Sequence, residues 1–520
     1  MKTLVIIYLL FFVSILYGTK IDELTRLANS GDSKSQYMLA KSYIDGNGVE
    51  KDFSKALYWA TKSTNGNNPD GLNLLAVIYR CGWGVEKNYD KAIELYQAAS
   101  KLNSDKALYN LGCIYFTGEF GVKDFKKAFE YFLKAAKLGY STAQMNVGVM
   151  YYNGIGTNKD NKLGFKWLET SARSGNIEAQ YKLGEFYYRG ELLSKNYTEA
   201  FKWCSLSAEK EYPPAQDLLG VMYYEGLGVK KNIKKGMELI SHSANSGWVS
   251  AQINMAIMLK SDPKKWNYWM QKAAEQGHPK AQYMLAMSYL DGSGIQRNEK
   301  VAVELLRKSA IQNDIDAIYT LGEYFECKKD SQKSFEYFYK ASKLRDPKAK
   351  NKLADIYMYG NTVVKKDVSK AIKLYEESAQ MGHIGSKATL GSIYLRGESV
   401  KKDLSKSFFY LEQSALLGNR NSWILMGVLY SMKDFSKYDL VKAGAWLTLY
   451  LEEGKLDKKK RDKLRNRNSD YPIDINLDDL SIGKRTKIKF TIPKEQIKSM
   501  FDIVDDIKKQ IEIQQTTSVK

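Results

Sequence analysis

The sequence is poor in the residues that carry most enzymatic and metal chemistry. Its 520 residues include four Cys and three His. Four cysteines cannot build a disulfide-dense scaffold, and three histidines leave little room for a catalytic dyad or a His-based metal site. Because 44% of the residues are hydrophobic and 12% are aromatic, the chain is not a disordered one. We expect a large folded protein whose function depends on shape more than on reactive groups.

Only the N-terminus carries a long apolar run. After Lys2, apolar residues extend from Leu4 to Tyr17 with one serine among them, and Gly18 follows. A membrane-spanning helix needs about 20 apolar residues, whereas export signals have a shorter run of about 13. We therefore expect residues 1–18 to be a signal peptide, with a retained anchor as the alternative. The expected location is periplasmic, cell-surface or secreted, or the endoplasmic-reticulum lumen in a eukaryote.

One motif recurs along most of the remaining chain. Ala107–Tyr115, Ala143–Tyr151 and Ala179–Tyr187 each read Ala-x-x-x-Leu/Val-Gly-x-x-Tyr, and the period is 36 residues. The small, large and aromatic positions share one face of a helix, and the glycine permits close approach of a second helix. Recurrence at this period is typical of stacked repeats, in which each unit buries its apolar face against its neighbours.

A second helix is predicted in every copy from its capping residue. Asp or Asn can accept hydrogen bonds from the free N–H groups of a helix start. The twelve residues at this position are Asp52, Asn88, Asp124, Asp160, Asn196, Asn232, Asp262, Asn298, Asp330, Asp367, Asp403 and Asp439. A large apolar residue, for example Trp167 or Tyr337, follows seven positions later and is expected in the core. The predicted fold is an all-α, right-handed α-solenoid superhelix of about twelve helix-turn-helix repeats over 35–450, with a capping half-repeat over 19–34.

The recurring residues resemble the Sel-1-like repeat family, a relative of the tetratricopeptide repeat. The shared pattern is Ala-x-x-x-Leu-Gly-x-x-Tyr, Gly-x-Gly-Val, Asp, Lys-Ala, an aromatic residue and Ala-Ala. The resemblance implies a non-enzymatic adaptor or scaffold for macromolecular complexes, and members are common among exported bacterial proteins, including factors in host-cell interaction. One secreted branch has a disulfide in every repeat. Cys81, Cys113, Cys204 and Cys327 fall at unrelated phases, so that branch's pattern is missing.

No constellation of residues predicts catalysis, a metal or a cofactor. His278 and His383 share one phase of the repeat but lie 105 residues apart, and His242 occupies another. We expect them to be surface or packing residues. The Gly-x-Gly turns lack the strand and the Gly-Lys-Ser/Thr of a phosphate loop, so they predict structural turns. The expected protein is not an enzyme.

The seventh repeat departs from the pattern and holds two candidate partner-binding residues, Trp266 and Tyr268. This copy lacks the usual turn, and Trp266 stands where most copies have a small residue. Either Trp266 fills the space left by the missing turn, or it is an exposed anchor for a protein partner.

Basic residues recur immediately before the capping position in ten copies. They are Lys51, Lys87, Lys123, Lys159, Lys195, Lys231, Arg297, Lys329, Lys366 and Lys402. Stacking would align them as a cationic ridge, and a cation beside a helix N-terminus gains nothing from the helix dipole. Within a chain of net charge +20, this ridge could contact an anionic polymer or membrane surface. The alternative is a solvated ridge without a partner.

Residues 451–520 form a basic C-terminal extension outside the repeats. Lys455–Arg467 is expected to be a solvated basic helix without the aromatic residues of nucleic-acid binding, and Tyr471-Pro472 to open an irregular stretch. A short strand over 487–492 and an amphipathic helix that covers the end of the array are predicted next. The leading function is an exported protein-binding scaffold; the alternative is an envelope-polymer or anionic-membrane module. Nucleic acid is not an expected partner.

Overall fold

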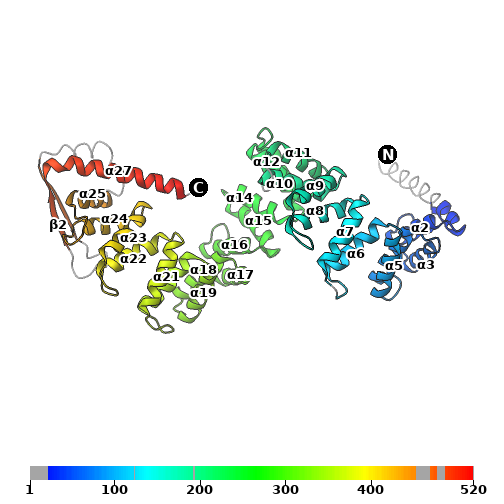
Figure 1. Cartoon of the computed structure of the whole chain (residues 1–520), viewed down its shortest axis with the longest axis horizontal. Coiled ribbons are helices and arrows are strands. Elements are labelled where there is room, and N and C mark those ends of the chain that lie inside the picture. Colours follow the sequence, from blue (N-terminus) through cyan, green and yellow to red (C-terminus); the bar gives the residue numbers. More distant parts are fainter. Residues whose placement is uncertain (1–20, 122, 191–193, 452–468, 477–486, 519–520) are drawn as a thin grey trace. The chain divides into compact units, whose positions relative to one another are not determined.

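The structure, a computed structural model, describes most of the chain. The described ranges are 21–121, 123–190, 194–451, 469–476 and 487–518. The chain divides into two compact units, residues 1–259 and 260–520, and each contains a run of stacked helical hairpins (Figure 1). The predicted signal peptide over 1–18 and the basic block over 455–467 lie outside the described residues. The prediction of an all-α solenoid is confirmed.

In the first unit, a helix over residues 21–29 precedes six complete hairpins within the described residues. The first helices of these hairpins and of the seventh repeat are α2 (Ser33–Asp45), α4 (Pro69–Cys81), α6 (Asp105–Thr117), α8 (Ser141–Asn153), α10 (Ile177–Arg189), α12 (Pro213–Glu225) and α14 (Val249–Met258). The second helices are α3 (Phe53–Thr64), α5 (Tyr89–Lys101), α7 (Phe125–Lys137), α9 (Asn161–Arg173), α11 (Tyr197–Ala208) and α13 (Ile233–Asn245). Each helix packs against the helices before and after it in this series.

The second unit begins with the second helix of the seventh repeat, α15 (Pro263–Glu275), and continues with five hairpins in the described residues. Their first helices are α16 (Pro279–Asp291), α18 (Ile315–Cys327), α20 (Pro347–Tyr359), α22 (Ile384–Arg396) and α24 (Arg420–Tyr430). Their second helices are α17 (Glu299–Ile311), α19 (Ser331–Lys343), α21 (Val368–Gln380), α23 (Leu404–Leu416) and α25 (Leu440–Leu451).

All twelve predicted caps are present. Each Asp or Asn side chain accepts a hydrogen bond from the backbone N–H three residues later, as Asp124 does from Lys127 at 3.0 Å. The N–H of the same Asp124 donates to the carbonyl of Tyr115, the aromatic residue that closes the first helix, at 2.9 Å. The capping residue therefore starts the second helix and closes the turn before it.

The centre of the core lies one residue beyond the predicted position on the second helices. Trp167 and Tyr337 are partly exposed. The residues that follow them, Leu168 and Phe338, are 0% exposed. A β-carbon on Gly148 of the facing first helix would lie 2.7 Å from the Leu168 side chain, so the glycine makes room for this next residue. In other copies the residue seven positions after the cap is itself buried: Trp59 is 8% exposed and Trp203 is 6% exposed.

The second glycine of the Gly-x-Gly turns contacts the preceding repeat. A β-carbon on Gly156 would lie 2.0 Å from the carbonyl oxygen of Phe125, and one on Gly228 would lie 2.1 Å from that of Tyr197. Both glycines have a φ of +69°, a conformation that other residues rarely adopt. These turns are therefore structural, as predicted, and they fix the spacing between successive hairpins.

The C-terminal extension packs onto the last hairpin. Strands β1 (Tyr471–Asn476) and β2 (Lys487–Ile492) pair antiparallel, and α27 (Lys494–Ser518) follows. The strand over 487–492 is confirmed, whereas the irregular stretch at Tyr471-Pro472 is wrong, because this segment pairs as a strand. Proline is tolerated on an edge strand, where its missing N–H need not pair.

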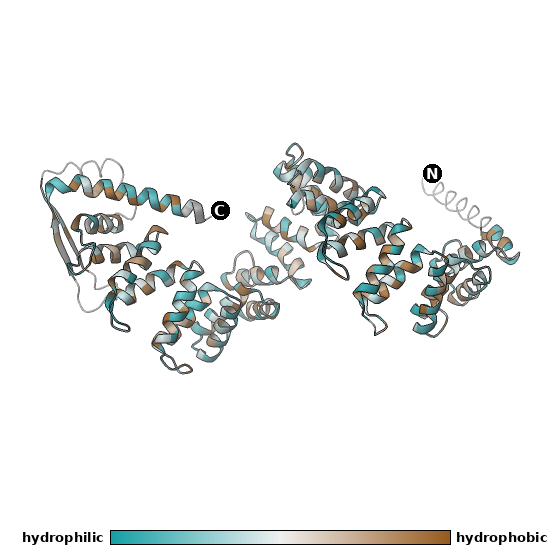
Figure 2. Cartoon of the chain, in the orientation of Figure 1, coloured by the Kyte–Doolittle hydropathy of each residue, from teal (hydrophilic) through white to brown (hydrophobic). Residues whose placement is uncertain are grey.

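Helix α27 is amphipathic, with apolar and polar segments alternating along it in Figure 2. Its side chains Ile497, Phe501, Val504 and Ile511 are buried in a cluster that includes residues of α23, α24 and α25. The apolar end of the last hairpin is thereby covered, as stacked repeats require.

Candidate functional site

Polar side chains on neighbouring first helices are joined from one repeat to the next. The Asn110 amide donates to Asn73 Oδ1 at 2.9 Å, and Asn254 donates to Asp217 Oδ1 at 2.8 Å. Each pair spans 37 residues. The residue types at these positions differ between copies, so this face carries features that belong to single repeats.

Asp217 is the most perturbed carboxylate of this set. Its side chain is only 7% exposed, and burial raises its pKa to about 6. Hydrogen bonds from Asn254 and Trp248 favour the ionised form but do not offset the loss of water around it. The group is a single carboxylate beside an amide and an indole, which is not an arrangement for acid–base catalysis.

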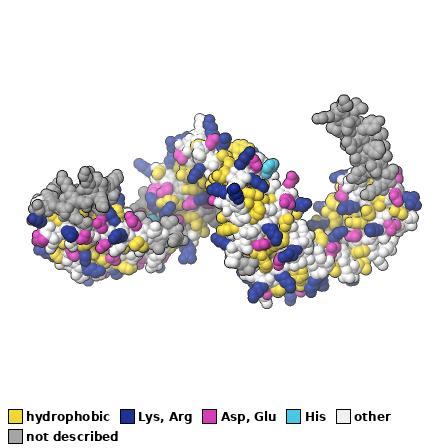
Figure 3. Space-filling model, turned by 90° about the horizontal axis from the view of Figure 1, so that it is seen from above, with side chains coloured by type: hydrophobic (Ala, Val, Ile, Leu, Met, Phe, Trp, Pro, Cys, Tyr) yellow, Lys and Arg dark blue, Asp and Glu magenta, His cyan; other side chains and the backbone are white. Residues whose placement is uncertain are grey.

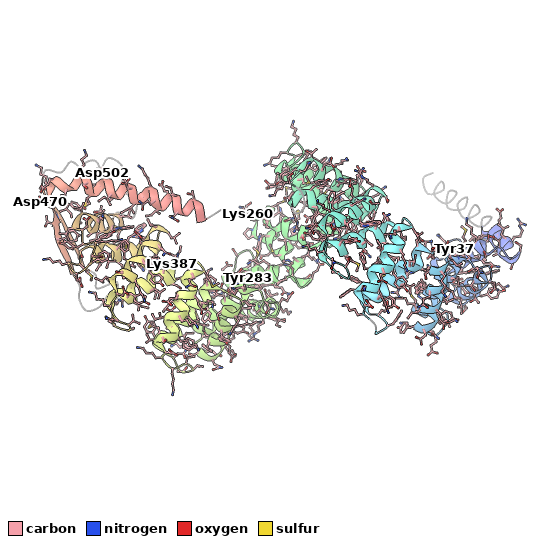
Figure 4. The ribbon with its side chains drawn as sticks, in the orientation of Figure 1. Tyr37, Lys260, Tyr283, Lys387, Asp470 and Asp502 are labelled. Atoms are coloured by element: carbon pink, nitrogen blue, oxygen red, sulfur yellow. The ribbon has the colours of Figure 1, made fainter. Side chains whose placement is uncertain are left out.

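Trp266 lines a cavity of about 340 Å³ in the second unit. The cavity is lined mainly by residues of α15 and α16, and its lining includes Tyr283, Met284, Met287 and Lys260. Figure 4 labels Tyr283 and Lys260. The indole is partly buried and has no ring partner among the described residues. Trp266 therefore occupies a surface cavity and does not complete a closed core.

Tyr268, the second predicted residue, does not line that cavity. Its ring is 53% exposed and makes an edge contact with Trp269 at 5.0 Å. The two candidates are thus separated on α15, and only Trp266 joins the side chains of α16.

The ten basic residues before the caps are all exposed, yet their aliphatic chains have a packing role. Most of them lie five residues after a glycine that has a positive φ and ends a first helix. A β-carbon on Gly118 would lie 3.0 Å from Lys123 Cβ, and one on Gly226 would lie 3.1 Å from Lys231 Cβ. The stem covers the helix end while the ammonium group stays in water.

This packing gives the recurrence of the ridge a cause that needs no anionic partner. Lys402 pairs with Asp434 at 3.0 Å, so at least one member is neutralised within the chain. In the view of Figure 3, basic side chains are interspersed with acidic and apolar ones. The sequence signal for this role is the five-residue spacing between the glycine and the basic residue.

Two of the three histidines cap first helices, a role that the sequence reasoning missed. The Nδ1 atom of His278 accepts from the Ala281 N–H at 3.3 Å, and that of His383 accepts from Ser386 at 3.1 Å. Burial lowers the pKa of His383, which keeps this nitrogen available as an acceptor. His242 is exposed on α13.

The described part of the chain contains no group of three or more His, Cys, Asp or Glu side chains placed to bind a metal ion. Across the same residues, no helix combines the length and apolar character that crossing a membrane requires.

A second cavity, of about 320 Å³, lies between α20, α22 and α24. Its lining includes Ile393, Ile424 and Leu425, with Arg396 beside them. The Nε atom of Arg396 is buried and has no hydrogen-bond partner. Sequence reasoning did not single out this residue.

These features define a helical-repeat protein whose distinctive side chains line surface cavities between its helices. The Sel1 repeat model matches eleven segments: 33–68, 69–104, 105–140, 141–176, 177–212, 213–248, 249–278, 279–314, 316–346, 347–383 and 389–419. The chain belongs to the Sel1 repeat family.

Two solved structures are similar to this chain. The crystal structure of c5321, a protective antigen present in uropathogenic Escherichia coli strains, is 26% identical with a TM-score of 0.59, and the match covers 86% of this chain and 98% of that one. A Sel1 repeat protein from Oxalobacter formigenes is 26% identical over 44% of this chain and 99% of its own, with a TM-score of 0.40.

A curated relative, NMB1327 of Neisseria meningitidis serogroup B, is 24% identical over 181 residues. That match spans 28% of this chain and 38% of the relative. Membership of the Sel1 repeat family suggests a protein–protein interaction scaffold.

Proposed function

We propose that the chain is an exported scaffold that binds protein partners through surface cavities between its helices, without chemistry of its own. The observation that carries this proposal is the cavity of Trp266, Tyr283, Met284 and Met287. Tryptophan and tyrosine are frequent anchors of protein interfaces, and methionine adapts its shape to different apolar groups.

The cavity suits a protruding side chain better than a small-molecule cofactor. Its volume of about 340 Å³ is near the lower limit of ligand pockets. Its edge carries one cation, Lys260, and one carboxylate, Asp291, which could orient a polar backbone around an apolar side chain. A partner that also contacts other repeats would gain affinity from several such sites.

Export is part of the same proposal and rests on the apolar run before Gly18. The partners would then belong to the bacterial envelope or to a host cell. We expect the chain isolated from an envelope or secreted fraction to begin after Gly18, as measured by N-terminal sequencing. A chain that keeps residues 1–18 and stays in the cytosol would contradict export but not binding.

Affinity capture from an envelope extract tests the binding function. The mature chain should retain a protein partner at both low and high salt, because the contact is mainly apolar. Trp266→Ala should lose this partner, whereas Tyr268→Ala, altered on the same helix but outside the cavity, should retain it. Circular dichroism melting of both variants checks that they fold.

Two results of this capture experiment would contradict the proposal. Recovery of only anionic lipid or glycan, released by salt, would replace the proposal with the surface-binding alternative. Loss of the partner from Tyr268→Ala but not from Trp266→Ala would move the contact away from the cavity.

A further inference from the structure

Arg396 has an unusual environment at the end of α22. It lines the cavity of about 320 Å³, next to the apolar side chains of Ile393, Ile424 and Leu425. Its Nε atom is buried without a hydrogen-bond partner, and no described carboxylate lies within ion-pair distance of its guanidinium. A buried donor that is left unsatisfied costs about 1–3 kcal/mol, so an acceptor from outside the chain would be favoured here.

The fifth repeat shows what this position looks like when it is satisfied. Arg189 ends α10 at the position that Arg396 holds in α22. One turn earlier, Glu185 accepts from Arg189 Nη2 at 2.7 Å. The corresponding residue of α22 is Ser392, which has no charge to offer. The eleventh repeat therefore keeps the cation and lacks its partner.

Arg396 is the cation among the residues that line the cavity. Helix α22 has no acidic residue that could pair with it. Lys387 of the same helix is half-buried (Figure 4) but does not line the cavity. Glu398 is the acidic residue on the rim, and it is exposed to water. Its charge would weaken the binding of an anion without occupying Arg396.

We infer that this cavity binds the C-terminal residue of a partner protein, with the carboxylate on Arg396 and an apolar side chain on Ile393, Ile424 and Leu425. This inference rests on the proposed binding function and names one partner feature that the chain would recognise. A guanidinium can donate two parallel hydrogen bonds to a carboxylate, and such charge-assisted bonds are stronger than neutral ones.

The spacing within the cavity favours a chain end over an acidic side chain. Ile393 and Arg396 are three residues apart on one helix, which places their side-chain origins about 5–6 Å apart. A C-terminal residue carries its carboxylate and its side chain on the same α-carbon, so it can reach both. An internal acidic residue would need an apolar residue nearby in the same segment. In an extended segment, adjacent side chains point to opposite sides, and side chains two residues apart are separated by about 6.6 Å.

The binding test uses fluorescein-labelled hexapeptides and fluorescence polarisation. Free-acid peptides that end in leucine, isoleucine or phenylalanine are compared with the same peptides as C-terminal amides, and with an amidated peptide that carries an internal glutamate beside leucine. We expect at least one free acid to bind and its amide to bind about tenfold or more weakly, since a hydrogen bond to a charged group contributes about 1.5–3 kcal/mol.

Variants of the full chain locate the contact. Arg396→Gln should weaken binding of the free acid about tenfold, and Ser392→Glu should do the same by giving Arg396 the internal partner that Arg189 has. Arg189→Gln is the matched control and should bind normally. Glu398→Gln should strengthen binding, because it removes a like charge from the rim. Thermal melting must show that the variants remain folded.

Several results would overturn the inference. These are failure of every apolar free acid to bind, equal binding of acid and amide, and unchanged binding by both Arg396→Gln and Ser392→Glu. Preferential binding of the internal-glutamate peptide would make an acidic side chain the occupant and reject the chain end. If the peptides fail while Trp266-dependent capture succeeds, the inference fails alone; if both fail, the proposed function fails too.

Discussion

Two kinds of position in this molecule differ in what they do. Asp124 has counterparts in all twelve repeats and Gly156 in several of them, and both hold hairpins together, one by capping and one by close backbone packing. Asp217 and Trp266 differ from their counterparts, and Arg396 lacks the acidic partner that its counterpart Arg189 has; each contributes to a buried polar contact or a surface cavity. The difference indicates that recurring residues build the array and that exceptional residues give it specificity.

The largest expected effect comes from a recurring glycine. Gly156→Ala should lower the free energy of unfolding by about 4 kcal/mol, because a left-handed backbone conformation and a clash with the Phe125 carbonyl act together. A β-carbon at this site would lie 2.0 Å from that oxygen. Urea denaturation measures the change.

Gly175→Ala is the control for this substitution. Gly175 also has positive φ, at +84°, but a β-carbon there meets no atom within 4 Å. Only the backbone penalty of about 1 kcal/mol should appear. Equal losses in the two variants would show that the turn does not fix the spacing of hairpins.

A smaller change in the free energy of unfolding, of opposite sign, is expected at Asp217. Burial raises the pKa of Asp217 to about 6, from an ordinary value of 3.8. The folded state therefore binds more protons than the unfolded state between these values, and stability falls as pH rises through this window. Asp217→Asn keeps an acceptor for Asn254 and should stabilise the first unit by up to about 3 kcal/mol above pH 6.

Well below pH 3.8 the aspartate is protonated in both states, so wild type and Asp217→Asn should converge in stability. Urea denaturation at about pH 3 and about pH 7.5 makes this comparison. A variant that is less stable than wild type at pH 7.5 would show that ionised Asp217 is a net stabilising residue.

The smallest effect concerns the basic residues before the caps. Lys123→Ala should cost about 0.5 kcal/mol by uncovering Gly118, whereas Lys123→Met, which keeps the aliphatic stem, should cost less. Thermal melting of both variants tests this difference. If Lys123→Ala and Lys123→Met lose the same stability, the aliphatic stem has no packing role. The recurrence of the basic residues would then have to be explained by their charge.

The sequence predicted the features that depend on local chemistry. Asp and Asn caps were identified because short polar side chains are the usual acceptors at a helix start, and the glycines because close packing needs them. The centre of the core was predicted at Trp167 but lies at Leu168, because periodicity defines a helical face only to within a residue or so. Strand β1 was not predicted, because it contains Pro472 and because it pairs with a strand that comes later in the chain.

The cavities could not be predicted in this way because they depend on contacts between repeats. Trp266 was noticed only as a departure from the pattern. Arg396 was missed because its distinguishing feature is the absence of an ion-pair partner. In the fifth repeat, Glu185 pairs with Arg189. In the eleventh repeat, Ser392 occupies the position of Glu185. A comparison of ion-pair spacing between repeats would have revealed it.

Site-specific photo-crosslinking tests most directly whether the cavity of Trp266 contacts the partner. A benzophenone amino acid would replace Met284 in the Trp266 cavity, or the exposed Tyr268 or Ile311 on second helices. The account predicts a partner adduct from position 284 and none from 268 or 311. Adducts from 268 or 311 with none from 284 would contradict it.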